Sequence, residues 1–217
     1  MSRLAEEGAV TVAALVLAAG GSSRLGRPKQ LEPWGDTTLL GHVVAQVREY
    51  AVDEIWVVLG AASEQILDTV DLTDCGVVEN PEWEEGIASS LRVGLDALSQ
   101  LSRAEAALIV IGDQPDIDPR VVAEVLGTFD GSATPVVIPK YRYTWGNPVM
   151  VGRALWPRLM SLEGDEGAQR LFKAHPEWVE EVWTDQLPPR DIDTESDLRE
   201  LRPRQLGSLS DGADPSR

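Results

Sequence analysis

The chain has 217 residues, of which 43% are hydrophobic and 25% are charged, a composition typical of one globular α/β domain rather than of a disordered or fibrous protein. Its 36 acidic and 19 basic residues give a formal net charge of -17, so the average surface repels nucleic-acid phosphates and anionic membranes. These figures argue against a nucleic-acid or membrane partner, and an anionic ligand therefore needs a local group of cations or a metal ion.

A single cysteine, Cys75, excludes an internal disulfide and a cysteine-rich zinc site. We therefore expect a protein of the reducing cytoplasm. The first residues carry Glu6 and Glu7 and no basic start, so they lack the layout of a signal peptide. We expect an N-terminal extension at 1–9, one domain at 10–202, and a disordered tail at 203–217, which is rich in Gly, Ser, Asp and Pro.

The apolar run Val12–Ala18 ends at two glycines and predicts a first strand buried on both faces of a sheet. Short apolar runs at 54–59 and 106–111 predict two more strands, each after a segment with helical spacing, at 39–50 and 87–101. This alternation predicts a three-layer α/β/α, Rossmann-like fold with a mainly parallel central sheet.

Asp118 and Pro119 are typical of a helix start and predict a helix over 119–129. The remainder of the domain reads as short strands and helices. The expected strands are at 136–139, 148–151 and 179–183, and the expected helices are at 155–162, at 168–174 and from Ser196 onward.

The loop from Gly20 to Lys29 combines three glycines with two serines and the cations Arg24, Arg27 and Lys29. Its backbone N–H groups can approach a polyphosphate closely while the cations neutralise it, so we predict a triphosphate site. The alternative is a flexible surface turn with incidental basic residues. A Walker A loop is excluded because Lys29 comes too late, and a dinucleotide fingerprint is excluded because Ser22 stands where its second glycine is required.

Residues 17–29 fill every fixed position of a nucleotidyltransferase signature: Leu-Ala-Ala-Gly, small residues, Arg, a hydrophobe, Gly, two variable residues and Lys. The chain thus resembles NTP transferases of GT-A-like fold, and among them the molybdenum cofactor cytidylyltransferases, with the molybdenum cofactor guanylyltransferases close by. Four more segments, in the family's order, extend the resemblance over residues 12 to 201. They are Asn80-Pro81 with Gly86 and Ser89-Ser90, Gly112-Asp113-Gln114-Pro115, Gly146-Asn147-Pro148, and Asp191-Ile192-Asp193-Thr194 with Asp197-Leu198.

The resemblance implies that an acceptor phosphate oxygen attacks the α-phosphorus of an NTP in line, and that pyrophosphate leaves without a covalent enzyme intermediate. It favours transfer of CMP, with GMP as the alternative, to a molybdopterin-type acceptor, and delivery of the product to a molybdenum hydroxylase. Asn147 departs from the pattern, because many relatives carry His there. Two other functions stay open: transfer to a sugar-1-phosphate or alditol phosphate, and a non-catalytic nucleotide-binding cofactor chaperone.

Asp113 directly follows the strand predicted at 106–111 and so lies at the carboxyl edge of the sheet, where open α/β sheets bind ligands. Carboxylates beside a triphosphate are typical ligands of Mg²⁺, and Mn²⁺ is an alternative. The resemblance assigns metal binding to Asp113 and Asp193, although Asp191 is an alternative to Asp193. A helix cap at Asp113 and a salt-bridged turn at Asp193 are the structural alternatives.

The resemblance also assigns the remaining site residues. Lys29 and Arg24 are expected to stabilise the leaving pyrophosphate and, with Asp113, to carry catalysis. Helix capping explains Ser89 and Ser90 as well as nucleotide binding does. The nucleotide-binding residues are Leu17, Ala18, Ala19, Gly20, Gly21, Ser22, Ser23, Arg24, Lys29, Asn80, Gly86, Ser89 and Ser90, and the acceptor-binding residues are Gln114, Asn147 and Pro148.

The seven tryptophans show no periodic pattern and are expected to be mostly core or partly buried. Trp145, beside Asn147, is a candidate for the wall of an acceptor pocket.

Overall fold

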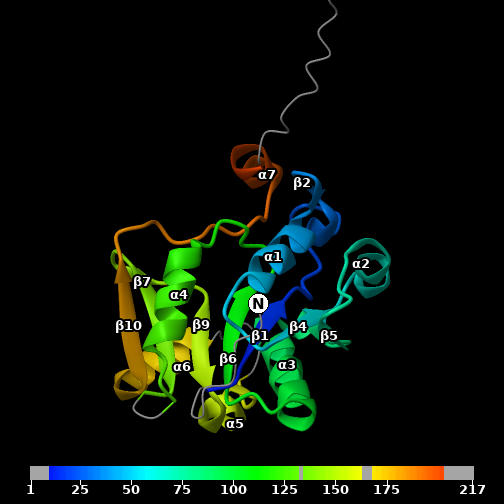
Figure 1. Cartoon of the computed structure of the whole chain (residues 1–217). Helices are drawn as coiled ribbons and strands as arrows, with labels where there is room; N and C mark the ends of the chain where they lie inside the picture. Colours follow the sequence, from blue (N-terminus) through cyan, green and yellow to red (C-terminus); the bar gives the residue numbers. More distant parts are fainter. Residues whose placement is uncertain (1–9, 132–133, 163–167, 203–217) are drawn as a thin grey trace, which may run out of the picture.

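The computed structural model describes residues 10–131, 134–162 and 168–202, so the expected extension and tail lie outside the described residues. Within them a sheet with the strand order β10-β7-β9-β6-β1-β4-β5 runs through the middle of the molecule, and β8 pairs with β7 (Figure 1). The strands are β1 (Val12–Leu17), β2 (Pro33–Trp34), β3 (Thr37–Thr38), β4 (Glu54–Leu59), β5 (Gly76–Glu79), β6 (Ala106–Ile111), β7 (Val136–Tyr141), β8 (Thr144–Trp145), β9 (Val149–Gly152) and β10 (Val179–Thr184). The helices are α1 (Leu39–Arg48), α2 (Ser63–Thr69), α3 (Ile87–Leu101), α4 (Pro119–Thr128), α5 (Trp156–Leu159), α6 (Ala168–Ala174) and α7 (Glu195–Leu201).

The central strand β1 is buried along its whole length because helices cover both faces of the sheet. Alternate side chains point to opposite faces, as the two-residue period of a strand requires. Val12, Ala14 and Val16 pack in one core with α1, α2 and α4, whereas Ala13 and Leu15 pack in a second core with α3, α5 and α6. The three-layer arrangement predicted from the sequence is thus confirmed.

The central sheet is mainly parallel, as predicted, with β1 parallel to both β4 and β6. Strands β9 and β8 are the exceptions, because β9 runs antiparallel to β6 and to β7, and β8 runs antiparallel to β7. Among the described residues, five short strands and helices were not predicted: β5, β8, α2, and the antiparallel pair β2 and β3. The helix expected at 155–162 is shorter, because its α-helical part ends at Leu159.

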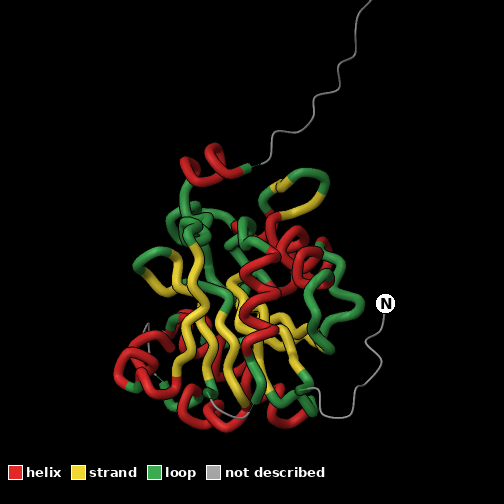
Figure 2. Tube along the Cα trace, turned by 60° about the vertical axis from the view of Figure 1, so that its left-hand side comes forward, coloured by secondary structure: helices red, strands yellow, loops and turns green. Residues whose placement is uncertain are grey.

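Helix α7 lies at the same end of the molecule as β2, beyond the carboxyl ends of the parallel strands (Figures 1 and 2). A small third core holds it there, in which Ile192 and Leu198 pack against Leu25, Trp34 and Leu39. This core fixes the segment around Asp191 and Asp193 over the edge where the Gly-rich loop begins. No helix among the described residues is both long and apolar enough to cross a membrane.

Asp118 caps α4, as predicted, by accepting a hydrogen bond from the backbone N–H of Arg120 at 2.8 Å. It also accepts one from Gln186 Nε2 at 2.6 Å, which links α4 to the segment after β10. We expect Asp118→Ala to lower the free energy of unfolding by about 1 kcal/mol, the usual effect of losing such a cap. Urea unfolding measures the change, and Asp116→Ala, at an exposed position nearby, is the matched control.

The contribution of Asp118 depends on its ionisation. Hydrogen bonds from Arg120 hold the pKa of Asp118 below its usual value, so the charged form is the one that stabilises the fold. The stabilisation is complete above the unfolded-state pKa of about 4 and is lost as the pH falls below it, toward the lowered folded-state pKa. Equal stability of the wild type and Asp118→Ala at neutral pH would contradict this account.

Candidate active site

The Gly-rich loop is tied back onto the sheet by Gln30, a residue for which no role was predicted. Its buried side-chain amide donates to the carbonyls of Ala18, at 2.9 Å, and Gly20, at 2.8 Å. Ser22, with a positive φ of 53°, accepts a hydrogen bond from the backbone N–H of Lys29 at 3.0 Å. The loop therefore has a fixed shape, and the bond from Ser22 sets where the side chain of Lys29 begins.

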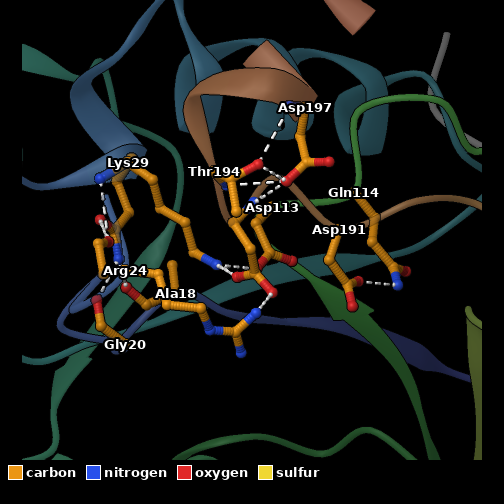
Figure 3. A network of polar contacts seen from close by, with 12 residues as sticks. Ala18, Gly20, Arg24, Lys29, Asp113, Gln114, Asp191, Thr194 and Asp197 are labelled. Carbon is orange, nitrogen blue, oxygen red and sulfur yellow. Dashed lines mark hydrogen bonds and ion pairs between the residues drawn. The ribbon is translucent and has the colours of Figure 1, made fainter. Parts of the chain in front are cut away.

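Lys29 reaches across the edge of the sheet to two carboxylates from distant parts of the chain (Figure 3). Its Nζ atom forms ion pairs with Asp113, after β6, and with Asp193, before α7, the latter at 2.8 Å. Arg24 Nη1 contacts the second oxygen of Asp193 at 2.7 Å. The side chain of Lys29 is only 12% exposed and that of Asp113 only 16%, so water screens this pair weakly.

The charges in this cluster depend on one another. Burial raises the pKa of Asp113, and the neighbouring Lys29 opposes that rise. Burial also disfavours the charged form of Lys29, but the carboxylates of Asp113 and Asp193 outweigh it and raise the pKa of Lys29. Burial of Asp193 is outweighed by Lys29 and Arg24, which lower the pKa of Asp193.

The Oδ1 atom of Asp113 is buried and has no hydrogen-bond partner among the described residues. A buried carboxylate oxygen without a partner is costly unless a ligand or ion completes it. No group of three or more metal-binding side chains occurs in the described part of the chain. Mg²⁺ is commonly held by one or two carboxylates together with substrate phosphates, so Asp113 and Asp193 fit a metal that arrives with a nucleotide.

Asp193 is placed beside Asp113 by local structure. The backbone N–H of Ile192 donates to the carbonyl of Asp113 at 3.1 Å, while the Ile192 side chain is fully buried in the small third core. Thr194 and Asp197 form a capping box at the start of α7, and Asp197 also accepts from the backbone N–H of Asp193 at 3.1 Å.

Arg27, the remaining loop cation, stays outside the carboxylate cluster. It pairs with Glu32 and Glu195 and so links the loop to the start of α7.

Asp191 lies on the other side of Asp113, in a separate network (Figure 3). Gln114 Nε2 donates to Asp191 Oδ1 at 2.6 Å, and Asn147 Nδ2 donates to Gln114 Oε1 at 3.1 Å. Tyr141 positions Asn147 in this network, since its hydroxyl donates to the backbone carbonyl of Asn147 at 2.7 Å. The two acidic residues that the sequence left as alternatives therefore face different surroundings.

Two cavities meet at Asp113. The first has a volume of about 280 Å³ and is lined by residues 17–21, Lys29, Gly86 and Ser90 among others. The second, of about 580 Å³, is lined by Gln114, Asn147 and Asp191 over apolar side chains that include Phe172. Four residues line both cavities, so the cavities adjoin near Asp113: Leu17, Ile87, Ile111 and Asp113.

The remaining predicted residues lie in or near the walls of these cavities. The buried amide of Asn80 donates to the hydroxyls of Ser89, at 2.8 Å, and Ser90, at 3.0 Å, and so holds the segment that carries Gly86. Ser23 is exposed in the loop. Pro148 is buried, and its neighbours Asn147 and Val149 line the second cavity.

Trp145 is partly buried, and its indole N–H donates to Glu181 at 2.7 Å.

Known proteins resemble this chain in both sequence and structure. A family model described as a MobA-like NTP transferase domain matches residues 14–179. The chain is 28% identical to a nicotine blue oxidoreductase from Paenarthrobacter nicotinovorans over 199 residues, 88% of this chain and 96% of that protein. The crystal structure of Rv0371c from Mycobacterium tuberculosis H37Rv is 34% identical and superposes with a TM-score of 0.79, covering 89% of this chain and 98% of that one. A structure of Rv0371C in complex with manganese, from the same organism, is 31% identical with a TM-score of 0.76 and the same coverage.

Proposed function

This chain belongs to the family of MobA-like NTP transferase domains, and we propose that it transfers a nucleoside monophosphate from an NTP to a molybdopterin-type phosphate. CMP is the favoured group and GMP the alternative. The observation that carries the proposal is the cluster of Lys29, Asp113 and Asp193 beside two adjoining cavities that both include Asp113 in their walls. In this proposal the enzyme acts in the cytoplasm, and a molybdenum hydroxylase receives the product.

The first cavity is proposed to hold the NTP. Its phosphates are bound by backbone N–H groups of the loop that begins at Gly20 and by the cations Lys29 and Arg24. Both cations contact Asp193 in this structure, so each must exchange a carboxylate oxygen for a phosphate oxygen when the NTP binds. An acceptor phosphate oxygen attacks the α-phosphorus, and the bond between that phosphorus and the bridging oxygen breaks. The electron pair leaves with pyrophosphate, on which Lys29 and Arg24 stabilise the growing charge.

Asp113 and Asp193 are proposed to hold the metal, with Asp191 assigned to the acceptor side. The unpartnered Oδ1 of Asp113 supports the first assignment, and the bond from Gln114 to Asp191 supports the last. A divalent ion bound there neutralises phosphate charge and acts as a Lewis acid. Mg²⁺ is the proposed ion, and the manganese complex of a relative supports Mn²⁺ as an alternative.

The second cavity is proposed to hold the acceptor, oriented by Gln114, Asn147 and Asp191. The acceptor's phosphate needs no general base when its second pKa of about 6 leaves it ionised at neutral pH. Gln114→Leu is expected to raise the KM for the acceptor on the order of tenfold and to leave the KM for the NTP unchanged, because it removes a buried hydrogen-bonding group from this cavity alone. Steady-state kinetics in both substrates measure the split, and equal increases in the two KM values would contradict it.

The test is pyrophosphate release with each of CTP, GTP, ATP and UTP, with Mg²⁺ or Mn²⁺ and with or without molybdopterin. Release with one NTP only when molybdopterin is present supports the proposal and identifies the base. Sugar-1-phosphates and alditol phosphates form parallel arms, and release with one of these instead would move the acceptor to that class. Nucleotide binding without release in any arm would leave a nucleotide-binding chaperone.

One relative bears an oxidoreductase name, which requires a separate arm. Ser22 stands where the dinucleotide fingerprint requires its second glycine, so we expect no oxidation of NADH or NADPH by this protein. The absorbance of the reduced cofactor, followed with a quinone-type dye as acceptor, measures this directly. Oxidation of NADH or NADPH without pyrophosphate release would contradict the transferase function and assign an oxidoreductase function to this protein.

A further inference from the structure

Trp83 lies in the wall of the first cavity, although no role in the site was predicted for it. It begins a short 3-10 turn, Trp83–Glu85, between β5 and α3, and it is only partly buried. Gly20, Gly21 and Ser90 line the same cavity. A large, partly exposed aromatic side chain thus lines this cavity beside the Gly-rich loop.

The indole of Trp83 is packed tightly against the loop. A Cβ atom at Gly21 would lie only 2.5 Å from the Trp83 ring, so position 21 tolerates no side chain while the ring stays in place. A Cβ atom at Gly60, after β4, would lie 2.9 Å from the Trp83 Cβ and 2.6 Å from the carbonyl of Ala19. Two glycines therefore accommodate this one tryptophan, which fixes its position beside the phosphate-binding loop.

The chain on both sides of Trp83 is also held in place. Asn80 Oδ1 accepts from the backbone N–H of Glu82 at 3.0 Å, while its amide donates to Ser89 and Ser90. The Ser89 hydroxyl lies 3.0 Å from the Glu82 carbonyl. These bonds tie the two ends of the segment from Asn80 to Ser90 to each other, and such preorganisation lowers the entropy lost when a ligand rests on the indole.

The first cavity is charged on one side and aromatic on the other. Asp113 follows β6 and pairs with Lys29, whereas Trp83 packs against Gly21 and Gly60, which follow β1 and β4. These strands are neighbours in the order β6-β1-β4, and Lys29, Asp113 and Trp83 all line the first cavity. A ligand with an anionic end and a flat aromatic end matches a cavity with these two sides.

We propose that Trp83 is the wall on which the nucleoside part of the NTP rests, with its base or ribose against the indole. The proposal rests on the function proposed above, because Lys29 and the loop fix the direction of the phosphates. Stacking on an aromatic side chain accepts any base. Trp83 therefore supplies affinity, and selection among bases falls to polar groups such as Ser90, which lines the same cavity.

The experiment measures binding by calorimetry with Mn²⁺ and non-hydrolysable α,β-methylene analogues of CTP and GTP, in parallel with inorganic triphosphate. Trp83→Ala is expected to weaken both analogues on the order of tenfold or more, the usual effect of removing a stacking partner. Binding of inorganic triphosphate should stay the same, and Trp83→Phe should retain most of the nucleotide affinity. Trp183→Ala is the matched control, because that tryptophan is 64% exposed on the edge strand β10.

Two results would overturn the assignment. An equal loss for inorganic triphosphate would show that Trp83 only supports the loop, and unchanged affinity for both analogues would show that the nucleoside lies elsewhere. The function proposed above fails differently. If the wild type binds the analogues through Trp83 but releases no pyrophosphate with any acceptor, the result supports the contact with Trp83 and contradicts the proposed transfer reaction.

Discussion

Asp113→Asn is expected to lower kcat for nucleotidyl transfer on the order of 1,000-fold while the protein stays folded. The magnitude corresponds to losing several kcal/mol of charge stabilisation by a metal. Asn keeps the shape of the side chain but provides one neutral oxygen in place of a carboxylate. Lys29 retains Asp193 as a counter-ion, so the cluster does not leave a buried charge alone.

Three measurements check this prediction: pyrophosphate release, Mn²⁺ binding in the presence of a non-hydrolysable NTP analogue, and thermal unfolding. We expect the first two to be lost and the third to change little. Asp116→Asn, at an exposed position three residues away, controls for the loss of one negative charge from the same loop. Transfer at the wild-type rate by Asp113→Asn would remove Asp113 from the reaction and favour a purely structural pairing with Lys29.

Much of the fold was predictable because its signals are local. Strand β1 is apolar at every position, and Asp118 with Pro119 defines a helix start without help from the rest of the chain. Strand β5 was missed because it is a short edge strand whose residues are half-buried or exposed, so it carries no apolar run. The reversed direction of β9 was also missed, since it depends on pairing with β6 and β7 rather than on its own residues.

The candidate site was likewise predictable only in part. The loop motif predicted Lys29, and the position of Asp113 after a strand predicted its place at the sheet edge. The different surroundings of Asp191 and Asp193 were not predictable, because they depend on burial of Ile192 between them in the small third core. Gln30 and Trp83 were missed for a related reason. Gln30 binds backbone carbonyls of the Gly-rich loop, and Trp83 packs against two glycines. Neither kind of contact can be recognised from the residue type or from its neighbours in the sequence.

Lys29→Met is expected to lower kcat on the order of 100-fold and, in the absence of nucleotide, to tighten the binding of Mn²⁺. The rate falls because the charge on the leaving pyrophosphate loses a positioned cation. The metal affinity rises because the ammonium of Lys29 occupies the carboxylates of Asp113 and Asp193 in the free protein. Met retains most of the apolar length of the Lys29 side chain, which is only 12% exposed, so the packing around it is kept.

These opposite signs separate a role in the site from a role in folding, since an unfolded variant loses both properties. Mn²⁺ titration followed by electron paramagnetic resonance measures the affinity, and single-turnover kinetics measure the rate. Lys140→Met is the matched control, because Lys140 pairs with Glu181 at 2.8 Å on strands β7 and β10. Weaker Mn²⁺ binding by a folded Lys29→Met protein would mean that Lys29 organises the two carboxylates instead of competing for them, and the exchange of Lys29 from carboxylate to phosphate would have to be abandoned.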